Sequence, residues 1–525
     1  MTIKTALFAL LATTIPSVGV AHGFAQRYDL PVPLALYLGG AAAAVALSFV
    51  VIAFFLRHDH GANGYWKANL LRSLPLRLLA HPVLTGLLRL LTVLVLLLVV
   101  IAGLFGNTNP FENFAPTTVW VIWWVGLAYV SGLAGDLWAL INPWNTVYRS
   151  LEWLARKLRP AKPTCLGIRY PKCLGDWPAV IIFLGFVWAE LVWLSSDSPR
   201  NLAWAVCAYS LTTWAGMLLF GRHVWLRHGE AFTLVFGFLA RFAPTEYRSK
   251  NTSPCIACTE SSSTSTHYSR TNCLECFEKA APENREFNIR PWAVGLLPAH
   301  PIRRSQMVLV LIMLSSVTFD GLLATPLWAS VAEWMLYSDA LRPAILLLQG
   351  PTGNAIAAIS TIALVLFLGG FQVLYALFSV LMRQATPGTF RTRVSRTEMA
   401  RLFVLSLVPI ALAYHLAHYL SFLMIVGQYM IPLISDPLGL GWDIFGTSLY
   451  VVNLAVVNAR FIWITAVIAI VTGHIAAVYL SHAMALRVFQ NRRAALLSQI
   501  PMLFLMVSYT TLSLWIMAQP VVETG

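Results

Sequence analysis

The sequence predicts an all-α fold, a polytopic membrane bundle of about ten transmembrane helices with a small cytoplasmic loop that resembles a zinc knuckle. Three observations predict it. Of the 525 residues, 58% are hydrophobic and only 11% are charged, whereas about 25% of the residues of a soluble globular protein are charged. Ten apolar runs approach the length of about 20 residues that crosses the bilayer core. The Lys and Arg residues gather in alternate loops between these runs.

The N-terminus has the pattern of a secretory signal peptide over residues 1–21. Lys4 precedes an apolar run, and the small residues Gly19, Val20 and Ala21 stand where signal peptidase cleaves. Cleavage leaves His22 as the first residue. The alternative is an uncleaved anchor, which the short length and Pro16 disfavour.

Five apolar runs precede a long polar stretch and five follow it. The chain therefore divides into residues 22–221 with the first five helices, a cytoplasmic loop over 222–306, and residues 307–525 with the last five. The predicted spans are 33–56, 84–106, 117–138, 178–195, 201–221, 307–327, 356–382, 402–426, 461–484 and 498–518.

The distribution of cations predicts the orientation, because Lys and Arg near helix ends stay in the cytoplasm. With the mature N-terminus outside, the inner loops hold 30 of the 36 Lys and Arg residues. We therefore expect a multi-pass protein of the bacterial inner membrane with both termini in the periplasm. Since insertion explains the basic excess, no nucleic-acid partner is expected.

The segment 230–244, EAFTLVFGFLARFAP, is apolar but too short to span. The pattern favours an interfacial helix on the inner surface. The alternative is a re-entrant helix that covers an inner vestibule.

The cytoplasmic loop contains four cysteines with the spacing C-x2-C-x14-C-x2-C, formed by Cys255, Cys258, Cys273 and Cys276. Two such pairs can present four thiolates tetrahedrally to a structural zinc ion. In the reducing cytoplasm a metal site is the better use of paired cysteines than a disulfide. An iron–sulfur cluster or a redox dithiol pair are the alternatives.

Five ionisable side chains fall between the middle and the outer half of the predicted spans: Glu190, Asp320, His415, His418 and His474. An ionisable group in hydrocarbon costs at least about 2.5 kcal/mol, so such residues are by default functional candidates. They come from four different helices, and we expect them to form one site.

The spacing of His415 and His418 places both imidazoles on one helix face, where they can bind a divalent transition metal. His474 would add a third nitrogen, and Asp320 or Glu190 would complete the site or act as a catalytic base toward metal-bound water. The alternatives are hydrogen bonding between helices and axial haem ligation by two of the histidines.

Four stretches resemble the bacterial membrane family named for fenitrothion hydrolase. They are AHGFAQRYDLPVPLALYLGGAAAAVALSF near the N-terminus, GDLWALINPW at 135–144, SVTFDG at 315–320 and YHLAHYLS at 414–421. The resemblance implies an aryldialkylphosphatase-like hydrolase, which cleaves the phosphorus to aryloxy bond of an organophosphorus triester. It also implies an apolar substrate that arrives from the lipid phase. The resemblance brings no established catalytic residues.

The sequence thus predicts a metal-dependent phosphotriesterase in which His415, His418 and His474 bind the metal and Asp320 or Glu190 activates water. A second membrane subunit is a further expected partner. The alternative function is a transporter or assembly factor for copper or another transition metal, and a third is a haem-binding electron carrier.

Overall fold

The computed structural model describes residues 28–56, 65–160, 164–250, 273–298, 300–388, 394–489 and 491–523. Within these ranges, nine helices are long and apolar enough to cross a membrane, so the chain is an all-α polytopic membrane protein, as predicted. Each of the ten predicted spans coincides with a helix. The fourth, α9 (Trp177–Leu191), has only 15 residues and is shorter than the roughly 20 that cross the bilayer at right angles. The predicted signal peptide lies outside the described residues.

Seven of the nine long segments are single α-helices, and each of the other two joins several shorter helices. The segment Phe114–Leu133 joins α5 (Phe114–Pro116), the π-helical η4 (Thr117–Gly126) and α6 (Leu127–Leu133). The segment Arg396–Ser435 joins α20 (Arg396–Phe403), η7 (Val404–Leu407), α21 (Val408–Ile425), η8 (Val426–Tyr429) and α22 (Met430–Ser435). The others are α2 (Leu34–Phe55), α4 (Pro82–Phe105), α10 (Pro199–Phe220), α15 (Arg304–Leu323), α18 (Ala355–Ala385), α23 (Ala459–Phe489) and α24 (Arg492–Val521).

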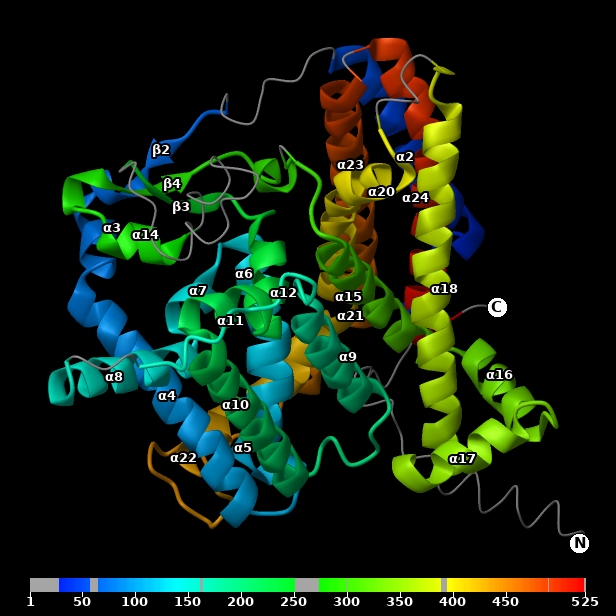
Figure 1. The fold of residues 1–525 in the computed structure, drawn as a ribbon. Helices are drawn as coiled ribbons and strands as arrows, with labels where there is room; N and C mark the ends of the chain where they lie inside the picture. The colour runs from blue at the N-terminus through cyan, green and yellow to red at the C-terminus, as the bar shows by residue number, and fades with distance from the viewer. Residues whose placement is uncertain are drawn as a thin grey trace, which may run out of the picture.

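Short helices connect and cover the long ones. They are α3 (Leu74–Leu79), α7 (Leu137–Ile141), α8 (Pro143–Leu158), α11 (Arg222–His228), α12 (Ala231–Ala240), α14 (Leu274–Lys279), α16 (Pro326–Tyr337) and α17 (Arg342–Thr352). In Figure 1, α16 and α17 lie beside one end of α18, and α20 lies between α23 and α18 toward their other ends.

The helix α21 occupies the centre of the bundle. In the segment that contains α21, 83% of the residues of the most apolar 18-residue stretch are buried, whereas the corresponding share is 17% in α2 and in α4. It packs mainly against α23, with α15 and η4 as further neighbours (Figure 1). Because α21 is surrounded by protein, its polar side chains meet other helices instead of lipid.

A small lobe stands beside the bundle (Figure 1). Its sheet has the order β2 (Ala68–Asn69), β4 (Arg285–Ile289), β3 (Thr245–Ser249), and both pairings are antiparallel. Between its strands, Arg290 and Glu246 form a buried ion pair of 2.9 Å, and the Tyr65 hydroxyl donates to Glu246. The sequence did not predict these strands, which are short and lie far apart along the chain. A second, two-stranded parallel pairing joins β1 (Tyr28–Asp29) to β5 (Val522–Glu523).

The helix α12, for which the sequence favours an interfacial position, is buried within the protein. Eight of its ten residues are buried, and it contacts α6, α9, α11 and α15. The segment is apolar on every side, and it packs against protein on most of its surface. Its N-terminus is capped by the fully buried Glu230, whose carboxylate accepts from the backbone N–H groups of Phe232 and Thr233.

Candidate functional site

Three of the five intramembrane candidates converge near the C-terminal ends of α9 and α15. Glu190 is the penultimate residue of α9, and Asp320 lies three residues before the end of α15. Both helices bring their carboxylates to the same face of α21, which carries His418 and the adjacent Tyr419. The site therefore forms where two helix ends meet the central helix.

A chain of hydrogen bonds joins these four side chains. The His418 Nε2 atom lies 2.8 Å from Oδ2 of Asp320. The Tyr419 hydroxyl lies 2.6 Å from the same carboxylate oxygen and 3.2 Å from Oε1 of Glu190. Tyr419 thus bridges two carboxyl groups that are 130 positions apart in the sequence. We name this set, Glu190, Tyr419, Asp320 and His418, the acid–base cluster.

The acid–base cluster is closed on one side and open on the other. The side chain of His418 is 2% exposed, whereas that of Asp320 is 20% exposed. A substrate or a water molecule would therefore meet the carboxylate first, with the imidazole held behind it. An Asp–His hydrogen bond of this kind fixes the orientation of the ring.

Aromatic side chains form the wall behind Glu190. The Trp124 Nε1–H donates to Oε1 of Glu190 at 2.6 Å, and the Trp124 ring contacts Phe186 and Phe183. Trp124 lies in the π-helical η4, and π-helical turns often occur at functional sites because they redirect side chains. The wall makes the surroundings of the two carboxyl groups apolar.

His415 lies next to the acid–base cluster without joining its hydrogen bonds. Its ring centroid is 4.7 Å from that of Tyr419 and 5.5 Å from that of Trp124. It borders a cavity of about 20 Å³. Its Nε2 atom is buried and has no hydrogen-bond partner among the described residues.

His474 lies elsewhere in the bundle. Its Nδ1 atom bonds the Ile470 carbonyl within α23 at 2.8 Å, and its ring faces Tyr509 of α24. In the described part of the chain, no three His, Cys, Asp or Glu side chains are arranged to hold a metal ion. The three-histidine metal centre expected from the sequence therefore has no geometric support, since its donors do not share one centre.

Half of the cysteine box can be described. Cys255 and Cys258 lie outside the described residues, whereas Cys273 caps the N-terminus of α14. The Cys273 sulfur accepts a hydrogen bond of 3.4 Å from the backbone N–H of Cys276. Such an N–H···S bond supports a thiolate ligand, so this pair fits one half of a zinc knuckle.

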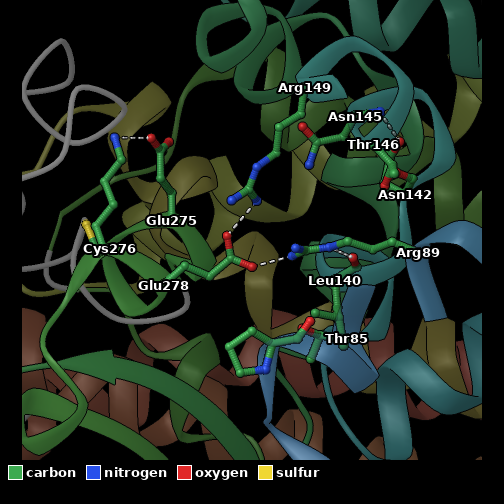
Figure 2. Close-up of polar contacts among 12 residues, drawn as sticks. Thr85, Arg89, Leu140, Asn142, Asn145, Thr146, Arg149, Glu275, Cys276 and Glu278 are labelled. Carbon is green, nitrogen blue, oxygen red and sulfur yellow. Dashed lines mark hydrogen bonds and ion pairs between the residues drawn. The ribbon is translucent and has the colours of Figure 1, made fainter. Parts of the chain in front are cut away.

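Ion pairs attach α14 to the membrane helix α4 and to the short helices α8 and α11; Figure 2 shows those of Glu278. Glu278 contacts Arg149 of α8 at 2.7 Å and also pairs with Arg89 of α4. One turn earlier, Glu275 pairs with Lys279 and with His223 of α11. Burial alone would raise the pKa of Glu275, but the hydrogen bonds from His223 and Lys279 prevail and lower it to about 2.

A second polar cluster, which the sequence did not reveal as a group, surrounds Glu230. The Trp138 indole and the Asn142 amide donate to its carboxylate at 3.4 and 3.3 Å, and Tyr209 also contacts it. Nearby, burial raises the pKa of Asp136 to about 6, although the Ala139 N–H that it accepts at the start of α7 opposes this shift. The stretch 135–144 is therefore a scaffold that holds the N-terminus of α12.

Tyr419 and Trp124 contact Glu190, but the sequence did not identify either as a site residue. The adjacency of Tyr419 to His418 was the available signal, because the neighbour of a site residue on a buried helix also faces protein. Nothing in the sequence marks Trp124 among the many tryptophans. Comparisons with known protein families, curated proteins and solved structures gave no match, so the function is inferred from the residues of the site.

Proposed function

We propose that this chain is a membrane-bound hydrolase of apolar organophosphorus triesters and that it cleaves the bond between phosphorus and the aryloxy oxygen. The observation that carries the proposal is the acid–base cluster, in which two carboxyl groups, a phenol and an imidazole are linked inside an apolar bundle. Two of the four stretches that resemble the fenitrothion hydrolase family, 315–320 and 414–421, meet in this cluster. That meeting supports the substrate class.

The hydrogen-bond pattern supports a shared proton. The Tyr419 phenol has one proton and contacts both Asp320 and Glu190. The contact with Asp320 is the shorter one, so we assign the phenol proton to it. The phenol oxygen can then accept a hydrogen bond from Glu190 when the Glu190 carboxyl is itself protonated. Two carboxyl groups around one phenol also disfavour a double negative charge. The pair then consists of one base and one acid.

These roles account for each bond and proton in the hydrolysis. A water oxygen attacks phosphorus while the Asp320 carboxylate takes the water proton and becomes neutral, and the bond from His418 holds Asp320 in position for this transfer. The bond from phosphorus to the aryloxy oxygen breaks, and Glu190 protonates the departing aryloxide. The products are a nitrophenol and a dialkyl thiophosphate when the substrate is fenitrothion. The Tyr419 bridge then returns the proton from Asp320 to Glu190.

The location of the cluster suits a substrate that dissolves in lipid. Asp320 is partly exposed, and it lies at the end of α15 that is opposite to Arg303 and Arg304. By the distribution of cations this end faces the periplasm, the small lobe lies in the cytoplasm, and the membrane is the bacterial inner membrane. The substrate would approach from the outer leaflet.

The test is nitrophenol release from fenitrothion by membranes that contain this chain, compared with its His418→Gln variant at equal expression. We expect the variant to lose most of the activity, because glutamine lacks the imidazole ring whose Nε2 atom positions Asp320. His81→Gln is the matched control, since His81 is exposed and caps the start of α4. Equal activity of His418→Gln and the wild type would refute the assigned site.

Inactivity of all three proteins leads to two further measurements. Activity that appears on co-expression with a second membrane subunit would keep the hydrolase assignment. Copper accumulation in vesicles without ester hydrolysis would support metal transport instead.

We further propose that the cysteine box of the lobe binds a structural zinc ion. The support is the spacing of the four cysteines and the capping geometry of Cys273 and Cys276. Purified protein should contain about one zinc ion per chain, and Cys276→Ser should lose it. Cys173→Ser is the control, because Cys173 is exposed and lies in another loop. Zinc content that is equal in both variants, measured by elemental mass spectrometry, would contradict this site.

A further inference from the structure

The helix α8 lies beside the small lobe and points out of the bundle. In Figure 1 it runs across the direction of α18 and α23, and its C-terminal end points away from them. Its first turn is fixed to α10, because the Trp144 indole donates to the Ser210 hydroxyl at 2.7 Å. Arg149, near its middle, pairs with Glu278 of the lobe at 2.7 Å. A helix across the direction of the membrane spans has the orientation of one that lies along a membrane surface.

One face of α8 packs on protein. Trp144, Tyr148 and Glu152 recur every four residues along this face, and all three are buried. Glu152 also forms an ion pair of 3.2 Å with Arg222 at the start of α11. These contacts fix how α8 is rotated about its axis, so they also determine which side chains remain exposed.

The neighbouring face carries three leucines that the described residues leave uncovered. Leu151, Leu154 and Leu158, which we name the leucine stripe, recur at helical spacing and are 55%, 45% and 71% exposed. The helix also contacts the membrane span α4, whose Leu90 and Leu94 are exposed to lipid. Apolar surface that faces lipid therefore borders α8, and exposure of the leucine stripe to water would be unfavourable.

The last two turns of α8 are basic. Arg156, Lys157 and Arg159, which we name the basic cluster, are all exposed, and residues 153–160 contain no Asp or Glu. The Lys157 ammonium lies 5.4 Å from the centroid of the exposed Trp153 ring. A leucine stripe beside cations and a tryptophan is the composition of helices that rest between the acyl chains and the headgroups of a bilayer.

We propose that α8 is an interfacial helix that binds anionic phospholipids, with the leucine stripe in the acyl layer and the basic cluster on the headgroup phosphates. Lipid is favoured over a protein partner because lysine is depleted from protein interfaces and because the lipid-facing surface of α4 adjoins the helix. By the distribution of cations this leaflet is the cytoplasmic one, where anionic lipids attract basic segments. The proposal does not rest on the hydrolase function.

Hydrogen–deuterium exchange of the full chain in lipid nanodiscs tests this surface. Discs of phosphatidylcholine alone are compared with discs of equal parts phosphatidylcholine and phosphatidylglycerol. A single chain per disc excludes a second copy as the occupant. We expect the backbone amides of 153–159 to exchange several-fold more slowly in the anionic discs, because headgroup contacts hold the end of α8 against the membrane and oppose its local opening.

A double substitution in the basic cluster should remove this difference. In Arg156→Gln with Lys157→Gln, Glu152 keeps its ion pair with α11, so the packing of α8 is preserved. The matched control is Arg200→Gln with Arg460→Gln, which removes two exposed cations from the first turns of α10 and α23. The control should keep the slower exchange in anionic discs. Leu154→Gln with Leu158→Gln should instead speed the exchange of 153–159 in both kinds of disc.

Four results would overturn the proposal. Equal exchange of the wild type in the two kinds of disc would show that α8 does not recognise anionic lipid. A difference that survives the substitution of Arg156 and Lys157 would mean that other cations respond to the lipid. Unchanged exchange in the leucine variant would show that the stripe lies outside the acyl layer. Slower exchange on addition of inorganic phosphate to phosphatidylcholine discs, equal to the effect of phosphatidylglycerol, would indicate anion binding without lipid.

Discussion

Asp320→Asn is expected to lower the rate of fenitrothion hydrolysis by about 10²- to 10⁴-fold, the range that a positioned acid–base group contributes. Asparagine keeps the size of the side chain and can still bond to His418 and Tyr419. It cannot take a proton from water. The measurement is nitrophenol release at saturating substrate, with the amount of folded protein determined by size-exclusion chromatography.

The matched control for this variant is Asp339→Asn, since Asp339 is exposed after α16 and contributes nothing to the acid–base cluster. Its activity should equal that of the wild type. Should Asp320→Asn retain full activity as a folded protein, the proton acceptor would lie elsewhere, and the assignment of the cluster would be wrong. Loss of both folding and activity would instead mean that Asp320 is needed to assemble α9, α15 and α21.

Hydropathy predicted the membrane helices well. Each apolar run coincides with a helix, because in a bilayer every backbone group must be satisfied within its own segment. The composite segment Phe114–Leu133 shows the limit of this reasoning. Its π-helical part is as apolar as an α-helix, so hydropathy alone does not reveal the change in the direction of its side chains.

Hydropathy also identified the ionisable residues within the helices, but the rotation of each helix about its axis could not be predicted. Asp320 and His418 do meet, and Glu190 joins them through Tyr419. His474 faces Tyr509 instead, because α23 is apolar on nearly every side and no stripe marks the face that it turns toward α21. A polar residue at the right depth is thus a candidate for a site, and packing decides whether it belongs.

The sheet of the small lobe could not be predicted from the sequence for another reason. Its sheet joins residues 68–69 to 245–249 and 285–289, which are distant in sequence and too short to have a clear alternation. Buried pairs such as Arg290 and Glu246 hold it together. These pairs are set by strand register, which no local pattern in such short strands specifies.

The second large effect is expected at the contact between α21 and α23. Gly473 of α23 has no side chain, and a Cβ atom there would lie 2.4 Å from Cβ of Ala413 and 2.8 Å from the Pro409 carbonyl oxygen. Gly473→Val would therefore force the two helices apart. Overpacking of a core commonly costs about 1–3 kcal/mol, and here the rigid backbone of α21 cannot move aside. We expect a clearly lower melting temperature, measured by size-exclusion chromatography of heated detergent extracts.

Gly369→Val is the control for this substitution, since no atom lies within 4 Å of the position that its Cβ would take in α18. The same two methyl groups would there meet lipid, and the melting temperature should stay at the wild-type value. Small residues let membrane helices approach closely, so the difference between the two variants measures the close packing of α21 on α23. Equal melting temperatures would contradict that packing. Because α21 carries both His415 and His418, such a result would also remove the geometric basis of the acid–base cluster.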